Sequence, residues 1–265
     1  GLWAWKHPHH DGTTTYHKLE GDITFTDVDF GYVPEKIVLH DVDLFASPGQ
    51  KIAFVGATGA GKSSILNLIG RYYDIQKGAI YIDDVDIRLL SKKQLRSAIG
   101  QMQQDVFIFE GTVESNIRLY NEEITEKEVR EAAEYVNASH FIEKLPLAYK
   151  EPVSERGSTF SAGERQLLSF ARTLAHKPSI LVMDEATANI DTDTESLIQE
   201  ALEKLMKGRT TIMVAHRLST IQHADCIMVM HKGKIREQGT HQELLAQDGI
   251  YRKLYELQIN HEVTA

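Results

Sequence analysis

The segment GATGAGKS, Gly56–Ser63, decides the fold of this 265-residue chain. It has the pattern G-x-x-x-x-G-K-S and follows the apolar run KIAFV, Lys51–Val55. After it, SSILNLIGRYY (63–73) has the apolar spacing of a helix. Glycines between a strand and a helix let main-chain N–H groups and the helix N-terminus face negative charge. The segment therefore predicts a phosphate-binding loop in an α/β protein.

Within this phosphate loop, Gly56–Ser63, two side chains have predicted roles. We expect Lys62 to reach the β- and γ-phosphates of a nucleotide and the Ser63 hydroxyl to ligate Mg²⁺. Other residues expected to surround the nucleotide phosphates are Gly56, Thr58, Gly59, Ala60, Gly61 and Ser64. The loop pattern is shared by kinases, GTPases and ATPases and does not separate them.

A second apolar run, ILVM at 180–183, ends in two acids, Asp184 and Glu185. Two carboxylates are costly inside a sheet, but at the carboxyl end of a strand they meet the ligand crevice of an α/β fold. We expect Asp184 to hold Mg²⁺ and Glu185 to act as general base for an attacking water. The alternative for this pair is an ordinary exposed strand end.

Strand patterns alternate with helical ones from Gly21 onward, which predicts βαβ units and a largely parallel sheet. Antiparallel-looking strands before Gly49 predict an attached β-subdomain. AIYIDDVDI (79–87) is interpreted as one strand, and strong helices are expected at Ala162–Ala175 and Thr194–Leu205. The predicted parts are one domain at 20–260, with a β-subdomain and loop-bearing core at about 20–100, a helical subdomain at about 105–172, the core continued at about 173–232 and C-terminal helices at about 240–258.

Residues 1–19 differ from the rest of the chain, since both tryptophans and four histidines lie there without any helix or strand period. The interpretations are a metal-binding histidine cluster, or a linker or segment left from cloning, and the second is favoured.

Composition limits the function classes. The net charge is −9, which argues against a nucleic-acid-binding protein, because such proteins carry a basic face. A single cysteine, Cys226, allows no internal disulfide and fits a reducing compartment. No run approaches the roughly 20 apolar residues that cross a bilayer, so this stretch of chain is expected to be soluble.

Further motifs follow in an order that resembles the ABC transporter ATPase family, and more closely its exporter-type domains. Phe160–Glu164 (FSAGE) is similar to the family signature LSGGQ, from which it departs at three of five positions, and ERQLLSFARTLAHKP continues as the signature helix does. The resemblance covers Gly21 to about Leu257. It implies a P-loop NTPase (RecA-like) core with a mainly parallel sheet, an antiparallel β-subdomain and an α-helical signature subdomain.

The resemblance also implies roles for single residues. Gln104 is similar to the glutamine that senses Mg²⁺ and the attacking water, with Gln103 as the alternative register. His216 matches the switch histidine at the γ-phosphate, and Tyr32 matches the aromatic ring that stacks on adenine. Residues implied to contact the ATP of an opposite chain are Ser161, Ala162, Gly163 and Glu164. The runs 155–157, 188–191 and 106–109 match an exporter-specific loop, a loop at the dimer interface and a surface that contacts the membrane domain.

Taken together, the resemblance implies an ATPase with ATP and Mg²⁺ as cofactors, placed at the cytoplasmic face of a membrane. Its implied partners are the transmembrane domain of the same transporter and a second ATPase domain, with no nucleic acid. The transported compound cannot be read from these residues. Rival hypotheses are an ATPase of DNA repair or translation, a regulatory subunit that binds ATP without turnover, and a P-loop kinase.

The unusual signature suggests asymmetry between the two ATPase domains. Ala162 and Glu164 stand where the family has glycine and glutamine, and this signature would serve the opposite chain's ATP. A carboxylate about 8 Å from a phosphate charge would be repelled by about 2 kcal/mol at an effective dielectric near 20. We therefore expect a non-identical partner, with a homodimer as the alternative.

Overall fold

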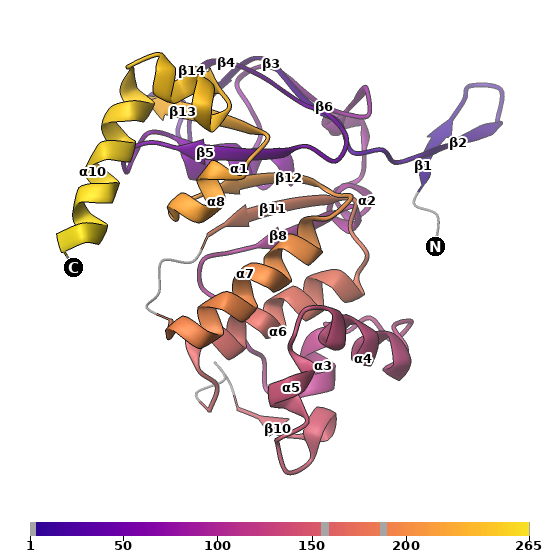
Figure 1. Cartoon of the computed structure of the whole chain (residues 1–265). Coiled ribbons are helices and arrows are strands. Elements are labelled where there is room, and N and C mark those ends of the chain that lie inside the picture. Colours follow the sequence, from indigo (N-terminus) through magenta and orange to yellow (C-terminus); the bar gives the residue numbers. More distant parts are fainter. Residues whose placement is uncertain (1–3, 155–158, 186–189, 265) are drawn as a thin grey trace. The chain divides into compact units, whose positions relative to one another are not determined.

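The computed structural model describes residues 4–154, 159–185 and 190–264. The chain divides into two compact units. The first comprises Gly1–Ile99, Ser179–Glu185 and Arg209–Ala265, and the second comprises Gly100–Pro178 and Ala186–Gly208. The alternation of strands and helices that the sequence predicted is confirmed (Figure 1).

A six-stranded sheet in the order β14-β13-β5-β12-β11-β8 carries the phosphate loop. Its strands are β5 (Lys51–Val55), β8 (Ile99–Met102), β11 (Ile180–Asp184), β12 (Thr210–Val214), β13 (Cys226–His231) and β14 (Lys234–Gly239). The neighbours β11, β12, β5 and β13 pair in parallel, and β14 is antiparallel to β13. Every residue of β12 is buried, as expected for a parallel strand covered on both faces.

An antiparallel sheet in the order β4-β3-β6-β7 forms the other layer of the first unit. Its strands are β3 (Ile23–Phe30), β4 (Leu39–Ala46), β6 (Lys77–Ile82) and β7 (Val85–Asp86). The prediction of one strand over 79–87 is wrong, because Asp83 and Asp84 take positive φ values of 48° and 62°. Two consecutive left-handed residues form the tight turn of a hairpin, which separates β6 from β7.

Helix α1 (Lys62–Ile69) packs into a core shared by both sheets. Its Ile65 and Leu68 belong to the same buried cluster as Phe54 of the parallel sheet and Phe25 of the antiparallel sheet. The sequence predicted that this helix continues to Tyr73, but it ends at Ile69 because Gly70 and the left-handed Arg71 leave the helical path. The remaining helices of this unit are η1 (Ile87–Leu89), α2 (Lys92–Ser97), α8 (Leu218–Gln222), α9 (His241–Ala246) and α10 (Ile250–Thr264).

The second unit is mainly helical. Its elements are β9 (Gly111–Thr112), α3 (Val113–Arg118), α4 (Glu126–Tyr135), α5 (Ser139–Ile142), η2 (Ala148–Lys150), β10 (Pro152–Val153), α6 (Ala162–Ala175) and α7 (Thr192–Met206). Capping boxes at Thr112, Thr125 and Ser161 fix where three of these helices begin. Helix α6 has the bounds that the sequence predicted.

A buried polar network shapes the start of the second unit. The Asn116 side chain accepts a hydrogen bond from the Phe109 N–H (2.8 Å) and donates one to the Phe109 carbonyl (2.9 Å). Arg172 of α6 donates to the carbonyls of Asn116 (2.9 Å) and Phe107 (3.0 Å). Burial lowers the pKa of Arg172 to about 10, so the guanidinium stays charged at neutral pH. The loop at 106–109, which the sequence placed at a membrane-domain contact, is thus tied to α6.

The N-terminal segment is more regular than expected. Ala4–Pro8 (β1) and Thr14–Lys18 (β2) pair as an antiparallel hairpin, where the sequence showed no period. Apolar and polar residues do not alternate there, because a two-stranded ribbon is defined by its turn and its inter-strand hydrogen bonds rather than by an apolar face. The side chains of His7 and His17 lie outside those described, so metal binding by the histidine cluster stays a prediction.

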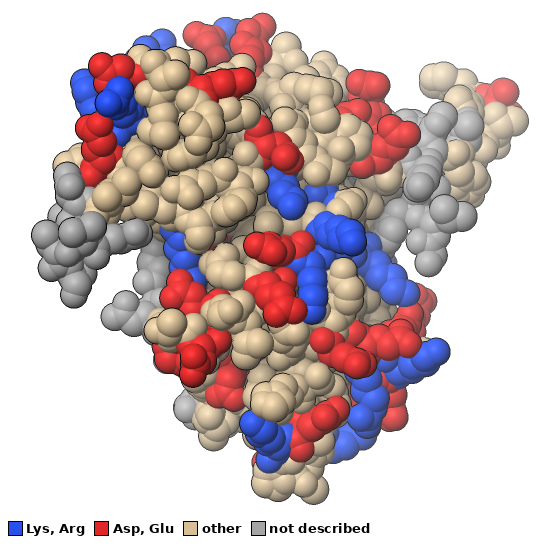
Figure 2. Space-filling model, in the orientation of Figure 1, with Lys and Arg blue, Asp and Glu red and all other residues tan. Residues whose placement is uncertain are grey.

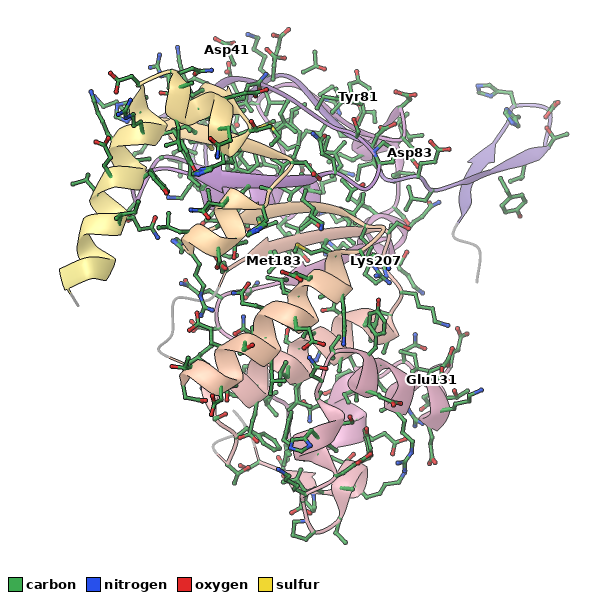
Figure 3. All side chains as sticks on the ribbon, viewed as in Figure 1. Asp41, Tyr81, Asp83, Glu131, Met183 and Lys207 are labelled. Atoms are coloured by element: carbon green, nitrogen blue, oxygen red, sulfur yellow. The ribbon has the colours of Figure 1, made fainter. Side chains whose placement is uncertain are left out.

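Asp83, labelled in Figure 3, fixes the chain just before β3. Its carboxylate accepts hydrogen bonds from the N–H groups of Glu20 (2.6 Å), Gly21 (2.8 Å) and Asp22 (2.9 Å). Burial, followed by the charges of Asp83 and Asp84, raises the pKa of Asp22. The left-handed turn of β6–β7 therefore presents one carboxylate to three consecutive main-chain donors.

Among the described residues, no helix is long and apolar enough to cross a membrane. On the face shown in Figure 2, the described Lys and Arg side chains are interspersed with Asp and Glu side chains.

Candidate functional site

The phosphate loop joins β5 to α1 and needs glycine at two positions. Gly56 has φ 150°, and a Cβ there would overlap the carbonyl oxygen of Met230. Gly61 has φ 101°, and a Cβ there would lie 2.7 Å from Leu39 Cδ2. Close packing and left-handed backbone together exclude side chains at both positions. The main chain is thereby held in the tight turn that leads into α1.

The remaining loop residues differ in exposure. Thr58, Gly59 and Ser63 are exposed and so accessible to a ligand, whereas Ala60 is buried. The Ala60 carbonyl accepts a hydrogen bond from Gly233 N–H at 3.0 Å, which anchors the loop to the β13–β14 turn.

The Lys62 ammonium folds back over the loop. It donates to the carbonyl oxygens of Gly56 and Ala57, the second at 3.2 Å. Burial lowers the pKa of Lys62, and the nearby charge of Asp184 opposes that shift. Because burial disfavours the charged form of Lys62, an anion brought beside this ammonium would offset that cost and favour the charged form. Lys62 is therefore suited to bind phosphate.

An aromatic group lies beside the start of α1. Tyr32 Oη is 2.9 Å from Ser64 Oγ, and the Tyr32 ring makes edge contacts with Phe30 (4.8 Å) and Tyr73 (4.9 Å). About half of Tyr32 is exposed, so one part of the ring is fixed and another can stack on a base. Ser64, predicted to contact the nucleotide, is buried with its hydroxyl engaged by Tyr32. Tyr73 was missed by sequence reasoning, although it follows the helix in the run RYYD.

Asp184, the last residue of β11, has an unusual acceptor atom. Asp184 Oδ1 is buried, lies 3.4 Å from His216 Nε2 and accepts no hydrogen bond from any residue that the structure describes. A buried oxygen without a donor is a costly arrangement that a bound cation would relieve. Carboxylate and hydroxyl oxygens are ligands that Mg²⁺ prefers, so Asp184 and Ser63 fit this metal.

The Glu185 carboxylate is buried and faces the segment after β12. Its Oε2 accepts from the N–H groups of His216 (2.7 Å) and Arg217 (2.9 Å), and its Oε1 accepts from Thr220 Oγ1 (2.5 Å). We name His216–Thr220 the switch segment. A carboxylate has about four acceptor sites, so, counting donors from the described residues only, one site on Oε1 is left for a water. The sequence predicted Glu185 as a base but missed Thr220.

Two other residues of the site were not foreseen at all. Gln258 of α10 donates from Nε2 to the His216 carbonyl at 2.5 Å. Arg217 supplies a main-chain N–H to Glu185. Gln258 is 42 residues from His216. Gln258 belongs to none of the sequence motifs described above.

The signature residues lie in the second unit, at the start of α6. Ser161 caps the helix, its hydroxyl accepting from the Glu164 N–H (3.1 Å) while Glu164 Oε1 accepts from the Ser161 N–H (3.0 Å). A Cβ at Gly163 would overlap Thr194 of α7, so packing requires glycine there. Ala162 is partly exposed at the first turn.

The other predicted motifs also belong to the second unit. Gln104 lies between β8 and β9 and its role stays a prediction. Residues 155–157 and, within the 188–191 motif, 188 and 189 lie outside the described residues. Asp191 caps α7 by accepting from the Thr194 N–H at 2.9 Å.

Known proteins match this chain in sequence and fold. The ABC transporter family profile matches residues 39–188. Putative ABC transporter ATP-binding protein exp8 of Streptococcus pneumoniae is 54% identical over 239 residues, which cover 90% of this chain and 41% of that protein. Probable multidrug resistance ABC transporter ATP-binding/permease protein YheH of Bacillus subtilis is 49% identical over 247 residues, covering 93% and 37%.

A solved structure agrees with these matches. A bacterial Atm1-family ABC exporter with ATP bound superimposes with a TM-score of 0.84 at 40% identity, over 90% of this chain and 42% of that one. The chain thus spans about two fifths of the length of the proteins it matches. Because the family profile covers more than half of the chain, the P-loop NTPase fold and the ATPase assignment inferred from GATGAGKS and FSAGE are confirmed. The chain belongs to the ABC transporter family and is an ATPase domain of it.

Proposed function

We propose that this domain hydrolyses ATP to drive export of a substrate by a membrane protein that contains it. The observation that carries the proposal is the convergence, within the first unit, of the phosphate loop, the unsatisfied Asp184 Oδ1 and the Glu185–switch hydrogen bonds. The assignment to export rests on the similarity to a probable multidrug resistance ABC transporter of Bacillus subtilis and to a bacterial Atm1-family ABC exporter. The domain would act at the cytoplasmic face of the membrane.

Binding of ATP would use groups already in place. The loop N–H groups and Lys62 would hold the β- and γ-phosphates, and the exposed part of Tyr32 would stack on adenine. Ser63 and Asp184 would hold Mg²⁺, with Gln104 as a further predicted ligand. The metal would neutralise charge that develops on the phosphates.

Hydrolysis would then depend on Glu185 and His216. Glu185 would accept a proton from the attacking water at the free acceptor site on Oε1. His216 would contact the γ-phosphate, with its main chain positioned by Glu185. With these roles the chain would be an active ATPase rather than a regulatory subunit, and with water as the acceptor it would not be a kinase.

A second ATPase domain would complete each site. We propose that Ser161–Glu164 contact the ATP held by an opposite chain, at the capped N-terminus of α6. In this signature the Glu164 carboxylate is held at the helix end by the Ser161 N–H. A fixed negative charge there opposes the approach of a phosphate. This favours a non-identical partner whose signature serves the catalytic site described above.

Lys62→Ala should weaken ATP binding about tenfold or more, because a charge-assisted hydrogen bond to phosphate is lost. Isothermal titration calorimetry of ATP against the wild-type and variant chains measures this. Lys92→Ala, at an exposed lysine of α2, is the matched control. Equal affinities for Lys62→Ala and wild type would remove the phosphate-loop assignment.

Glu185→Gln should keep ATP binding and lower the rate of phosphate release by about a hundredfold or more, since the base is removed. The fold should survive, because the amide oxygen can still accept from His216 and Arg217 while the amide nitrogen donates to Thr220 Oγ1. Phosphate release and thermal unfolding are measured together. A near wild-type rate would place the base elsewhere.

The specific ATPase activity of the 265-residue chain should rise with its concentration, because each site needs a second chain and nothing here tethers the two. Phosphate release is followed over a thousandfold dilution series. A constant specific activity would contradict weak self-association and indicate a self-sufficient monomer or a stable dimer.

A protein as long as the relatives that contains this domain should have low ATPase activity when it is expressed alone. The reason is that the proposed contact of FSAGE with the ATP of the opposite chain would be weak. Co-expression with a partner of LSGGQ type should raise it. Replacing Glu164 by Gln, with Glu131→Gln as an exposed control, should raise the activity of the protein alone. Brisk activity and transport without a second subunit would refute the heterodimer.

A further inference from the structure

The main chain of His216 is held on both sides by side chains from two distant elements. Its N–H donates to Glu185 Oε2, at the end of β11 (2.7 Å), and its carbonyl accepts from Gln258 Nε2 of α10 (2.5 Å). Glu185 is the proposed base for hydrolysis, whereas no role has yet been assigned to Gln258. The two hydrogen bonds together define where the peptide planes around His216 lie.

A cavity of about 270 Å³, partly open to solvent, adjoins this segment. The cavity is lined by Gly56 of the phosphate loop, by His216, and by residues of α8 and α10. Side chains in a closely packed interior are positioned by contacts on all sides, but a segment that lines such a cavity has fewer contacts on that side. The directional hydrogen bond from Gln258 therefore supplies a restraint that contacts do not.

Helix α10 is itself firmly anchored two turns before Gln258. Glu237 of β14 accepts from the N–H groups of Ile250 (2.6 Å) and Tyr251 (3.2 Å) at the helix start. Tyr251 is buried, and its hydroxyl lies 2.6 Å from His241 Nδ1. Burial raises the pKa of Tyr251 to about 12 and lowers that of His241, so both stay neutral at physiological pH and the contact persists.

The spacing of three residues along α10 connects the anchored start of the helix to the switch segment. Tyr251, Tyr255 and Gln258 follow one another at i, i+4 and i+7, which places them on one face of the helix. The two rings stack with centroids 6.3 Å apart, and all three residues line the cavity. Figure 1 shows α10 as the yellow helix at the C-terminal end of the chain.

We propose that Gln258 is a positioning residue for the switch histidine. Through the His216 carbonyl it holds the imidazole near Asp184, where Nε2 lies 3.4 Å from Oδ1, and so prepares it for the γ-phosphate. The C-terminal helix α10 thereby takes part in hydrolysis without touching the nucleotide. This inference rests on the proposed ATPase function of the same site.

Two variants remove the donor while keeping the length of the side chain. Gln258→Met is apolar and suits the cavity, and Gln258→Glu is polar but has no N–H at neutral pH. An effect common to both follows from the lost donor, because their polarity differs. Gln242→Ala, at an exposed glutamine of α9, is the control.

Two measurements are made on the 265-residue chain. Without nucleotide, amide hydrogen exchange at His216 and Arg217 should become about three- to tenfold faster in both variants, as one hydrogen bond is lost. With ATP, kcat should fall about three- to tenfold while the KM for ATP changes by less than about twofold. The thermal midpoint should stay near that of Gln242→Ala.

Exchange at His216 and Arg217 that matches wild type in both variants would overturn the proposal. So would faster exchange across the whole first unit with a lowered thermal midpoint, which is the sign of a merely structural role. If the wild-type chain releases no phosphate at any concentration, the proposed function fails, and the exchange measurement still decides whether Gln258 positions His216.

Discussion

The buried Glu185 carboxylate, which accepts the N–H groups of His216 and Arg217, is the interaction on which the arrangement of the site depends. It joins the carboxyl ends of the neighbouring parallel strands β11 and β12. Because these strands run in register, the acidic end of one and the switch segment of the other start at the same edge of the sheet. The phosphate loop leaves that edge from β5, which pairs with β12. The carboxylate of Glu185, the proposed base, thus holds His216 next to Asp184, the residue proposed to bind the metal.

Much of the fold could be predicted because local and global signals agree. The glycines of GATGAGKS, the apolar run before Asp184 and the capped α6 each specify one conformation, and the structure has all three. The predicted element boundaries were wrong where the backbone conformation of a residue differs from the one that its residue type suggests. Asp83 and Asp84 look like part of a strand, yet their left-handed φ values make a turn, and Arg71 ends α1 in the same way. Such conformations are accessible to Asp and Arg but are not signalled by them.

Sequence reasoning proposed the residues of the candidate site but not their contacts. Lys62, Asp184 and His216 were proposed because each belongs to a short motif. The partners of Glu185 and the role of Gln258 were not, since hydrogen bonds to main-chain groups leave no trace in residue type. The contacts of the signature residues were likewise not predicted. Position 163 must be glycine because a Cβ there would overlap Thr194 of α7, and the Glu164 carboxylate accepts the capping-box hydrogen bond from the Ser161 N–H. Neither constraint is visible without the packing of α6 on α7.

The three hydrogen bonds to Asp83 have a mechanical consequence. A pull on the chain before Gly21 would load all three together, because consecutive N–H groups converge on one carboxylate. Rupture would then require the three hydrogen bonds to break at the same time. When an edge strand is peeled from a sheet, by contrast, its hydrogen bonds break one after another. The load would pass from the backbone into the β6–β7 turn and from there into the antiparallel sheet. Force arriving along the N-terminal segment would therefore move the antiparallel layer as one body instead of unzipping β3.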